Sequence, residues 1–245
     1  MIAETGGQNA LIVDSSALPE QVVADLLTSA FQSAGQRCSA ARLLYLQDDV
    51  SDRVIDMLAG AMDELRIGDP GRIAIDIGPV IDEAAAKRLE THLANMDRRV
   101  AHRLAAPKGG WFVGPAVVRI DSPSDLPGEV FGPILHVLRW RAGHLDQVVD
   151  AINATGFGLT LGLHSRIGDT IDLVRGRARV GNVYVNRSMI GAVVGAQPFG
   201  GEGLSGTGPK AGGPNYVRRF ATERVVSIDT TSAGGNASLM AIEDE

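Results

Sequence analysis

The stretch that decides the fold is LPEQVVADLLTSAFQSAGQRCSAARLLYLQDDVSDRVIDMLAGAMDELRIGDP, residues 18–70. Its first part spaces apolar residues as a helix does, with Pro19 at the entry, and predicts a helix over residues 18–36. The apolar run ARLLYLQ at residues 41–47 predicts a strand, and residues 48–67 return to helical spacing. A strand between two such helices is typical of a parallel sheet with crossover helices.

The same alternation continues along most of the chain. Further helices are expected at residues 82–99, 144–153 and 169–177. Further strands are expected at residues 100–104, 111–113, 116–120, 134–140, 159–164 and 182–185. With 245 residues, of which 44% are hydrophobic, the chain can bury a substantial core. We therefore expect an α/β fold, with a mostly parallel sheet and flanking helices.

A glycine- and proline-rich segment at residues 190–214 interrupts this pattern. Within it, GEGLSG at residues 201–206 matches the dinucleotide fingerprint G-x-G-x-x-G, and Glu223 follows at the distance of a ribose-binding acid. That fingerprint needs a strand before it and a helix opening through it, because the helix N-terminus receives the pyrophosphate. The surrounding prolines and glycines predict neither, so we interpret the segment as a loop with unusual backbone angles.

Composition excludes several classes of protein. The net charge of -6 argues against a nucleic-acid partner, which needs a basic face. No apolar run approaches the ~18 residues of a membrane span, and the first ten residues lack the features of a signal peptide. The single cysteine excludes an internal disulfide, and the five histidines lack metal-ligand spacing. We expect a cytoplasmic protein without a metal site.

The single cysteine, Cys38, has two interpretations from the residues alone. Free cysteines are often buried and act as small hydrophobic residues. Alternatively, Cys38 is a nucleophile whose thiolate the preceding Arg37 favours, although Arg37 fits a surface position equally well.

Five short stretches, taken in order, favour the nucleophile. They are ETGGQNA (residues 4–10), GQRCSA (35–40), EVFGPIL (129–135), GNVYVNRS (181–188) and QPFGGEGLSGTG (197–208). Together they resemble the aldehyde dehydrogenase superfamily, over residues 4–228. The segments GAQPFGG (195–201) and KAGGPNY (210–216) are most similar to L-glutamate γ-semialdehyde (pyrroline-5-carboxylate) dehydrogenases, in particular the modules within bifunctional proline utilization A proteins.

The resemblance implies NAD-dependent oxidation of L-glutamate γ-semialdehyde to L-glutamate through a cysteine thiohemiacetal and thioester. Cys38 is then the nucleophile, and its backbone N–H contributes to the oxyanion hole. Glu4 is the general base for thioester hydrolysis, a role that a carboxylate can perform if it is buried. Composition alone favours the alternative, a solvated acid near the N-terminus. The cofactor contacts are Glu129 and Phe131. The substrate contacts are Ser39, Gly191, Ala192 and Phe199.

The resemblance also implies a catalytic domain over residues 1–228 and a flexible acidic tail over residues 229–245. Because members of that family are much longer, we expect most of the N-terminal dinucleotide-binding domain to lie outside this chain, and the NAD site to be incomplete. The chain by itself is then expected to have little turnover. The expected partners are a small-molecule aldehyde and either further copies of the chain or a complementing N-terminal half.

Two alternatives remain open. One is a non-catalytic remnant or assembly module derived from an aldehyde dehydrogenase. The other is a cysteine hydrolase, which is disfavoured because no histidine stands in a recognisable base context.

Overall fold

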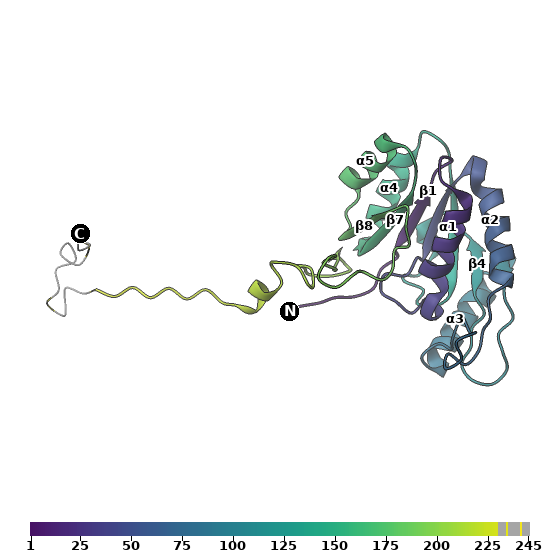
Figure 1. Cartoon of the computed structure of the whole chain (residues 1–245), viewed down its shortest axis with the longest axis horizontal. Helices are drawn as coiled ribbons and strands as arrows, with labels where there is room; N and C mark the ends of the chain where they lie inside the picture. The colour runs from purple at the N-terminus through teal and green to yellow at the C-terminus, as the bar shows by residue number, and fades with distance from the viewer. Residues whose placement is uncertain (230–233, 235–240, 242–245) are drawn as a thin grey trace.

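The computed structural model describes residues 1–229, 234 and 241, so the tail expected at residues 229–245 lies almost entirely outside the described residues. Its centre is a seven-stranded sheet in the order β3-β4-β5-β2-β1-β7-β8 (Figure 1). The strands are β1 (Ala10–Val13), β2 (Leu43–Gln47), β3 (Val100–Arg103), β4 (Ala116–Arg119), β5 (Ile134–Trp140), β7 (Thr160–His164) and β8 (Asn182–Val185). Every neighbouring pair is parallel except β3 and β4. The expected α/β fold with a mostly parallel sheet is confirmed.

The centre of the sheet is apolar because helices cover both of its faces. All residues of β1, β2 and β7 are buried. β1 was not expected, since only the four residues ALIV form it, yet it lies between β2 and β7. The strand expected at residues 111–113 is wrong: this segment is irregular, with Trp111 exposed although Val113 is buried in the core.

Five helices surround the sheet: α1 (Pro19–Leu26), α2 (Asp48–Asp63), α3 (Glu83–Asn95), α4 (Leu145–Ala154) and α5 (Gly168–Arg177). Val137 of β5 shares a surface recess with Ile55 of α2, whereas Leu138 shares another with Val148 of α4. Because successive strand residues point to opposite faces, α2 and α4 cover opposite faces of the sheet (Figure 1). None of the described helices combines the length and apolarity that crossing a membrane requires.

The first helix is shorter than expected. α1 ends at Leu26, a π-helical turn follows at Leu27–Phe31, and residues 33–35 then turn with left-handed backbone angles. The expected helix over residues 18–36 is therefore wrong at its C-terminal end. Apolar spacing does not register this change, because Ala30, Phe31 and Ala34 are all buried in the core.

The segment at residues 201–206 is not a dinucleotide-binding turn. Glu202–Gly203 form β9, which pairs antiparallel with β6 (Phe157–Gly158), and no helix opens through these residues. Gly191, Gly195, Gly203, Gly208 and Gly212 have positive φ angles. The expected loop with unusual backbone angles is confirmed.

Candidate active site

A cavity of about 370 Å³ lies beyond the amino ends of the parallel strands. It is lined by Glu4, Thr5, Gly6, Cys38, Glu129, Phe131, Leu159, Phe199, Gly200, Gly201 and Ser205. Five of the eight predicted site residues are in this group: Glu4, Cys38, Glu129, Phe131 and Phe199. The cysteine is exposed, so the core-filler interpretation is wrong.

The other three predicted residues do not line the cavity. Ser39 is buried, and its carbonyl oxygen accepts a hydrogen bond from Thr160 Oγ1 at 3.3 Å. Gly191 and Ala192 lie in the loop that follows β8, and Gly191 is exposed with a φ angle of 73°. The structure therefore brings the predicted nucleophile, base and cofactor contacts together, but of the predicted substrate contacts only Phe199.

The backbone before Cys38 is strained. Ser33, Ala34 and Gly35 have φ angles of 58°, 53° and 64°, and each non-glycine residue in this region costs of order 1–3 kcal/mol. At Gly35 a Cβ would lie 2.2 Å from the carbonyl oxygen of Gly132, so only glycine fits. The left-handed turn redirects the chain from the end of the helical segment toward the cavity.

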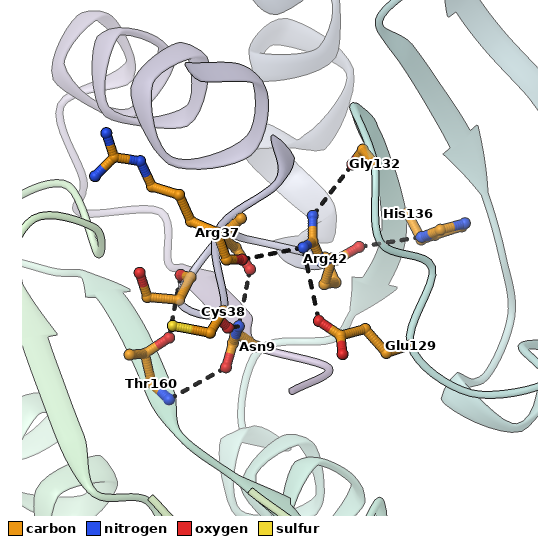
Figure 2. A network of polar contacts seen from close by, with 10 residues as sticks. Asn9, Arg37, Cys38, Arg42, Glu129, Gly132, His136 and Thr160 are labelled. Atoms are coloured by element: carbon orange, nitrogen blue, oxygen red, sulfur yellow. Dashed lines mark hydrogen bonds and ion pairs between the residues drawn. The ribbon is translucent and has the colours of Figure 1, made fainter. Parts of the chain in front are cut away.

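Asn9 fixes the nucleophile loop, defined here as residues 36–42. Its Nδ2 donates to the carbonyl oxygens of Cys38, at 2.7 Å, and Ala40, at 2.9 Å (Figure 2). Its Oδ1 accepts a hydrogen bond from the backbone N–H of Thr160 at 3.2 Å. The sequence offered one signal for this residue, its place directly before the apolar run ALIV, and its role was not predicted.

Arg42 is a second residue that the sequence did not single out. Its side chain is 1% exposed, and its guanidinium donates to the carbonyl oxygens of Gly132 and Arg37, each at 3.1 Å. It also lies 3.6 Å from Glu129 Oε1 and 4.9 Å from the centre of the Phe131 ring. Burial lowers the pKa of Arg42 to about 10, and the charge of Glu129 partly offsets this effect.

Arg37, the arginine next to Cys38 in the sequence, is not buried in the site as Arg42 is. Arg37 is exposed, its Nε donates to Ser33 Oγ at 3.2 Å, and its side chain extends away from Cys38 (Figure 2). The surface interpretation of Arg37 is therefore correct, and the cation built into the site is Arg42.

Glu129 connects the nucleophile loop to the N-terminal segment. A Cβ on Gly6 would lie 2.1 Å from Glu129 Oε2, and the Gly7 backbone hydrogen-bonds the carboxylate. Burial raises the pKa of Glu129, and the nearby Arg42 charge opposes that rise. The two glycines of ETGGQNA thus allow the carboxylate to approach the backbone closely.

Glu4 lies at the rim of the cavity. Its backbone pairs with Gly206, its side chain is 48% exposed, and its Oε1 lies 3.8 Å from Arg219. Glu4 is therefore not buried, and its exposure is that of the alternative, a solvated acid. The residue is held by the glycine-rich loop and by one arginine, not enclosed by apolar side chains.

Two histidines extend the contacts of Arg42 on the side away from the cavity. The buried His136 places Nδ1 3.2 Å from the Arg42 carbonyl oxygen, and His92 Nε2 lies 2.9 Å from His136 Nε2. Because a carbonyl oxygen only accepts, His136 donates from Nδ1 and accepts from His92 at Nε2. Burial, reinforced by His92, lowers the pKa of His136 to about 3, so this ring is neutral.

This arrangement suits nucleophilic chemistry at Cys38 without a histidine base. No histidine lines the cavity, which disfavours a cysteine hydrolase. Two carboxylates and an exposed aromatic ring surround the thiol instead, and within the described part of the chain no three metal-binding side chains cluster.

Comparison with known proteins agrees with this geometry. Residues 1–226 match the aldehyde dehydrogenase family. The chain is 56% identical over 234 residues to bifunctional protein PutA of Klebsiella aerogenes, covering 91% of this chain and 18% of that protein. It is 34% identical to 1-pyrroline-5-carboxylate dehydrogenase of Geobacillus thermodenitrificans, over 93% of this chain and 45% of that protein.

A solved structure gives the same result. The crystal structure of a mutant of proline utilization A (PutA) from Bradyrhizobium japonicum matches with a TM-score of 0.90 and 59% identity, covering 95% of this chain and 24% of that one. The chain thus spans less than half the length of each of these relatives. The resemblance seen in the sequence is confirmed, and the chain belongs to the aldehyde dehydrogenase family.

Proposed function

We propose that this chain provides the catalytic domain for NAD-dependent oxidation of L-glutamate γ-semialdehyde to L-glutamate. The observation that carries the proposal is the meeting of Cys38, Glu4, Glu129 and Phe131 in one cavity. The names of the relatives, PutA and 1-pyrroline-5-carboxylate dehydrogenase, support the choice of substrate.

The residues present fit the nicotinamide end of NAD. The Phe131 ring is 44% exposed at the cavity and offers a surface to the nicotinamide ring, and the Glu129 carboxylate offers acceptors to ribose hydroxyls. When bound, NAD accepts the hydride that leaves the substrate carbon. Because no helix opens through residues 201–206, this segment offers no comparable cradle for the phosphates.

Cys38 starts the reaction as a thiolate. Its sulfur forms a bond to the aldehyde carbon, and the carbonyl electron pair moves onto the oxygen. The Cys38 backbone N–H stabilises this oxyanion, while the Asn9 and Arg42 contacts hold the loop. The oxygen then reforms the double bond as the hydride departs, which leaves a thioester on Cys38.

Glu4 completes the cycle by activating water. Its carboxylate takes a proton from a water molecule, whose oxygen attacks the thioester carbonyl. The carbon–sulfur bond then breaks, Cys38 leaves as a thiolate, and the product is a carboxylic acid. The exposed position of Glu4 gives it access to water at the cavity rim.

The substrate carboxylate is assigned to the glycine-rich loop. Backbone N–H groups of the glycine-rich loop at Gly191 and Ala192 suit an anion, and Phe199 lines the cavity where the aliphatic chain of the substrate would lie. Ser39 joins this set only if the loop shifts, because its side chain is buried in the described conformation.

We assign the catalytic domain to residues 1–228 and a cytoplasmic setting to the reaction, which the single cysteine supports. The segment at residues 217–228 extends from the body of the molecule (Figure 1) and exposes Val217, Phe220, Val225, Val226 and Ile228. An apolar segment of this kind favours association, so we assign it to contacts with further copies or a complementing N-terminal half.

The proposal is tested by measuring NADH formation from L-glutamate γ-semialdehyde. We expect little turnover from the 245-residue chain alone and clear turnover after it is mixed with the remainder of the dehydrogenase module of a PutA relative. The aldehyde is also expected to protect Cys38 from alkylation. A mixture without turnover in which the aldehyde gives no protection would overturn the proposal in favour of a non-catalytic assembly module.

A further inference from the structure

We propose that Arg42 is a positioning residue that holds the nucleophile loop against the segment of Glu129 and Phe131. The inference rests on the proposed function, since it concerns the same site. It assigns Arg42 a task that Arg37, the cation next to Cys38 in the sequence, does not perform.

The contacts of Arg42 join two distant parts of the chain. Its guanidinium donates to Arg37 within the nucleophile loop and to Gly132 in the segment before β5, both at carbonyl oxygens 3.1 Å away. A planar guanidinium can reach two acceptors in fixed directions at once, which a lysine cannot do. One side chain therefore ties the nucleophile loop to the segment that carries Glu129, in addition to the backbone pairing of β2 with β5.

A purely stabilising role does not explain this residue. Arg42 is 1% exposed, its Nε has no hydrogen-bond partner, and its nearest carboxylate oxygen is 3.6 Å away. Burying a charge with incomplete pairing is costly, and apolar residues of similar volume are often equally stable at such positions. The guanidinium instead donates to two carbonyl oxygens and lies beside one carboxylate, and these three groups meet only at the site.

The backbone near Arg42 shows why a contact between the nucleophile loop and the segment at Gly132 matters. Gly35 approaches Gly132 so closely that no Cβ fits, and the turn before it is left-handed and strained. A strained turn persists only when its surroundings fix it. Arg42 binds the same Gly132 carbonyl oxygen that faces Gly35, so it acts where the two segments touch.

The test uses the sole cysteine as a probe. A nitroxide label on Cys38 reports the mobility of the nucleophile loop by electron paramagnetic resonance, with no further substitution needed. We expect Arg42→Gln to give a more mobile label and amide hydrogen exchange at residues 36–40 at least about tenfold faster, because charged hydrogen bonds are the stronger class. Arg37→Gln, the matched control, leaves both signals unchanged.

Two further variants keep the test decisive. Arg42→Lys retains the charge but not the planar guanidinium, so we expect the label on Cys38 to have intermediate mobility. If circular dichroism shows that Arg42→Gln does not fold, the mobility in Arg42→Lys serves as the test. Glu129→Gln is expected to raise mobility when Arg42 is present and to add nothing in the Arg42→Gln background.

The proposal is overturned if the folded Arg42 variants are less stable than the parent chain but give the same label mobility and exchange rates. These readouts need neither substrate nor NAD. Failure of the proposed function, seen as missing turnover and missing aldehyde protection, is therefore distinguishable from failure of this inference.

Discussion

The two ends of the parallel strands differ in how their polar groups are used. At the amino ends, Cys38 and Phe131 are exposed, and Glu4 has a single charged partner at 3.8 Å. At the carboxyl ends of β1 and β7, polar side chains are buried and bonded to one another. Asp14 Oδ1 accepts from Ser16 N and Oγ, at 2.8 and 2.6 Å, and Asp14 Oδ2 accepts from Ser165 Oγ.

The carboxyl-end network occupies the place where open α/β sheets usually bind ligands. The strand order reverses between β1 and β7, and the crevice outside such a reversal is the usual site. Here Asn186 Oδ1 accepts from Ser165 N at 3.0 Å, and Asn186 Nδ2 donates to Ser165 O at 2.8 Å. The polar groups of Asp14, Ser165 and Asn186 are thus paired with one another, whereas those at the amino ends are exposed or incompletely paired, as the proposed chemistry at Cys38 requires.

The largest expected effect is the loss of turnover on substituting the nucleophile. Cys38→Ser should reduce aldehyde oxidation in the complemented enzyme at least about a thousandfold, because the hydroxyl is a far weaker nucleophile. The free energy of unfolding should change by no more than about 0.5 kcal/mol, since Cys38 is exposed. The NADH assay measures turnover, and urea unfolding measures the free energy of unfolding. A large loss of stability would contradict the contrast between the amino and the carboxyl ends of the strands.

Substitution at the carboxyl ends of the strands should lower the stability of the fold but leave the reactivity of Cys38 unchanged. Asp14→Ala removes a buried acceptor of three hydrogen bonds and is expected to lower the free energy of unfolding by about 4 kcal/mol. The folded fraction should keep the alkylation rate of Cys38. Asp52→Ala, which removes an exposed ion pair with Arg139, is the control and should cost less than about 1 kcal/mol by urea unfolding.

Gly35 and Gly191 both have left-handed backbone angles, but only at Gly35 would an added Cβ overlap another atom. Comparing the two alanine variants therefore distinguishes the cost of backbone strain from the cost of the overlap. Gly35→Ala should cost about 3 kcal/mol, because its Cβ would overlap the Gly132 carbonyl oxygen in addition to the φ penalty. Gly191→Ala meets no atom within 4 Å and should cost only the penalty of about 1 kcal/mol. If both variants lowered the melting temperature equally, the close approach of Gly35 to the Gly132 carbonyl oxygen would be contradicted.

The smallest effect is a pH dependence that differs between buried histidines. The pKa of His136 is about 3 in the folded chain and ordinarily about 6.5, so between these values the unfolded chain binds the extra proton. Stability should therefore fall as the pH falls below about 6.5, by about 2 kcal/mol between about pH 7 and about pH 5.

His136→Gln should remove most of that slope in urea unfolding. His164→Gln, at the carboxyl end of β7, should remove less: burial lowers the pKa of His164, but the Asp25 charge opposes the shift. A slope that is unchanged in His136→Gln would contradict the buried neutral ring.

Much of the molecule could be predicted because its signals are local or shared with a family. Apolar spacing gave the helices and most strands, and five of the eight predicted site residues do line one cavity. The failures have physical reasons. β1 is only four residues long, and the helix after Pro19 changes to left-handed angles without changing its apolar spacing. Residues 111–113 are irregular although Val113 is buried, so apolar character alone did not predict a strand there correctly.

The sequence by itself determined the α/β alternation and the family, and it singled out Cys38 as the proposed nucleophile. Only the tertiary structure decided what holds that nucleophile in place. Asn9 bonds a residue 29 positions away, and Arg42 bonds one 90 positions away, so neither contact leaves a pattern in nearby residues. Arg37, the arginine that the sequence places beside Cys38, points to solvent, because strand packing brings Arg42 into the buried position where the two segments meet.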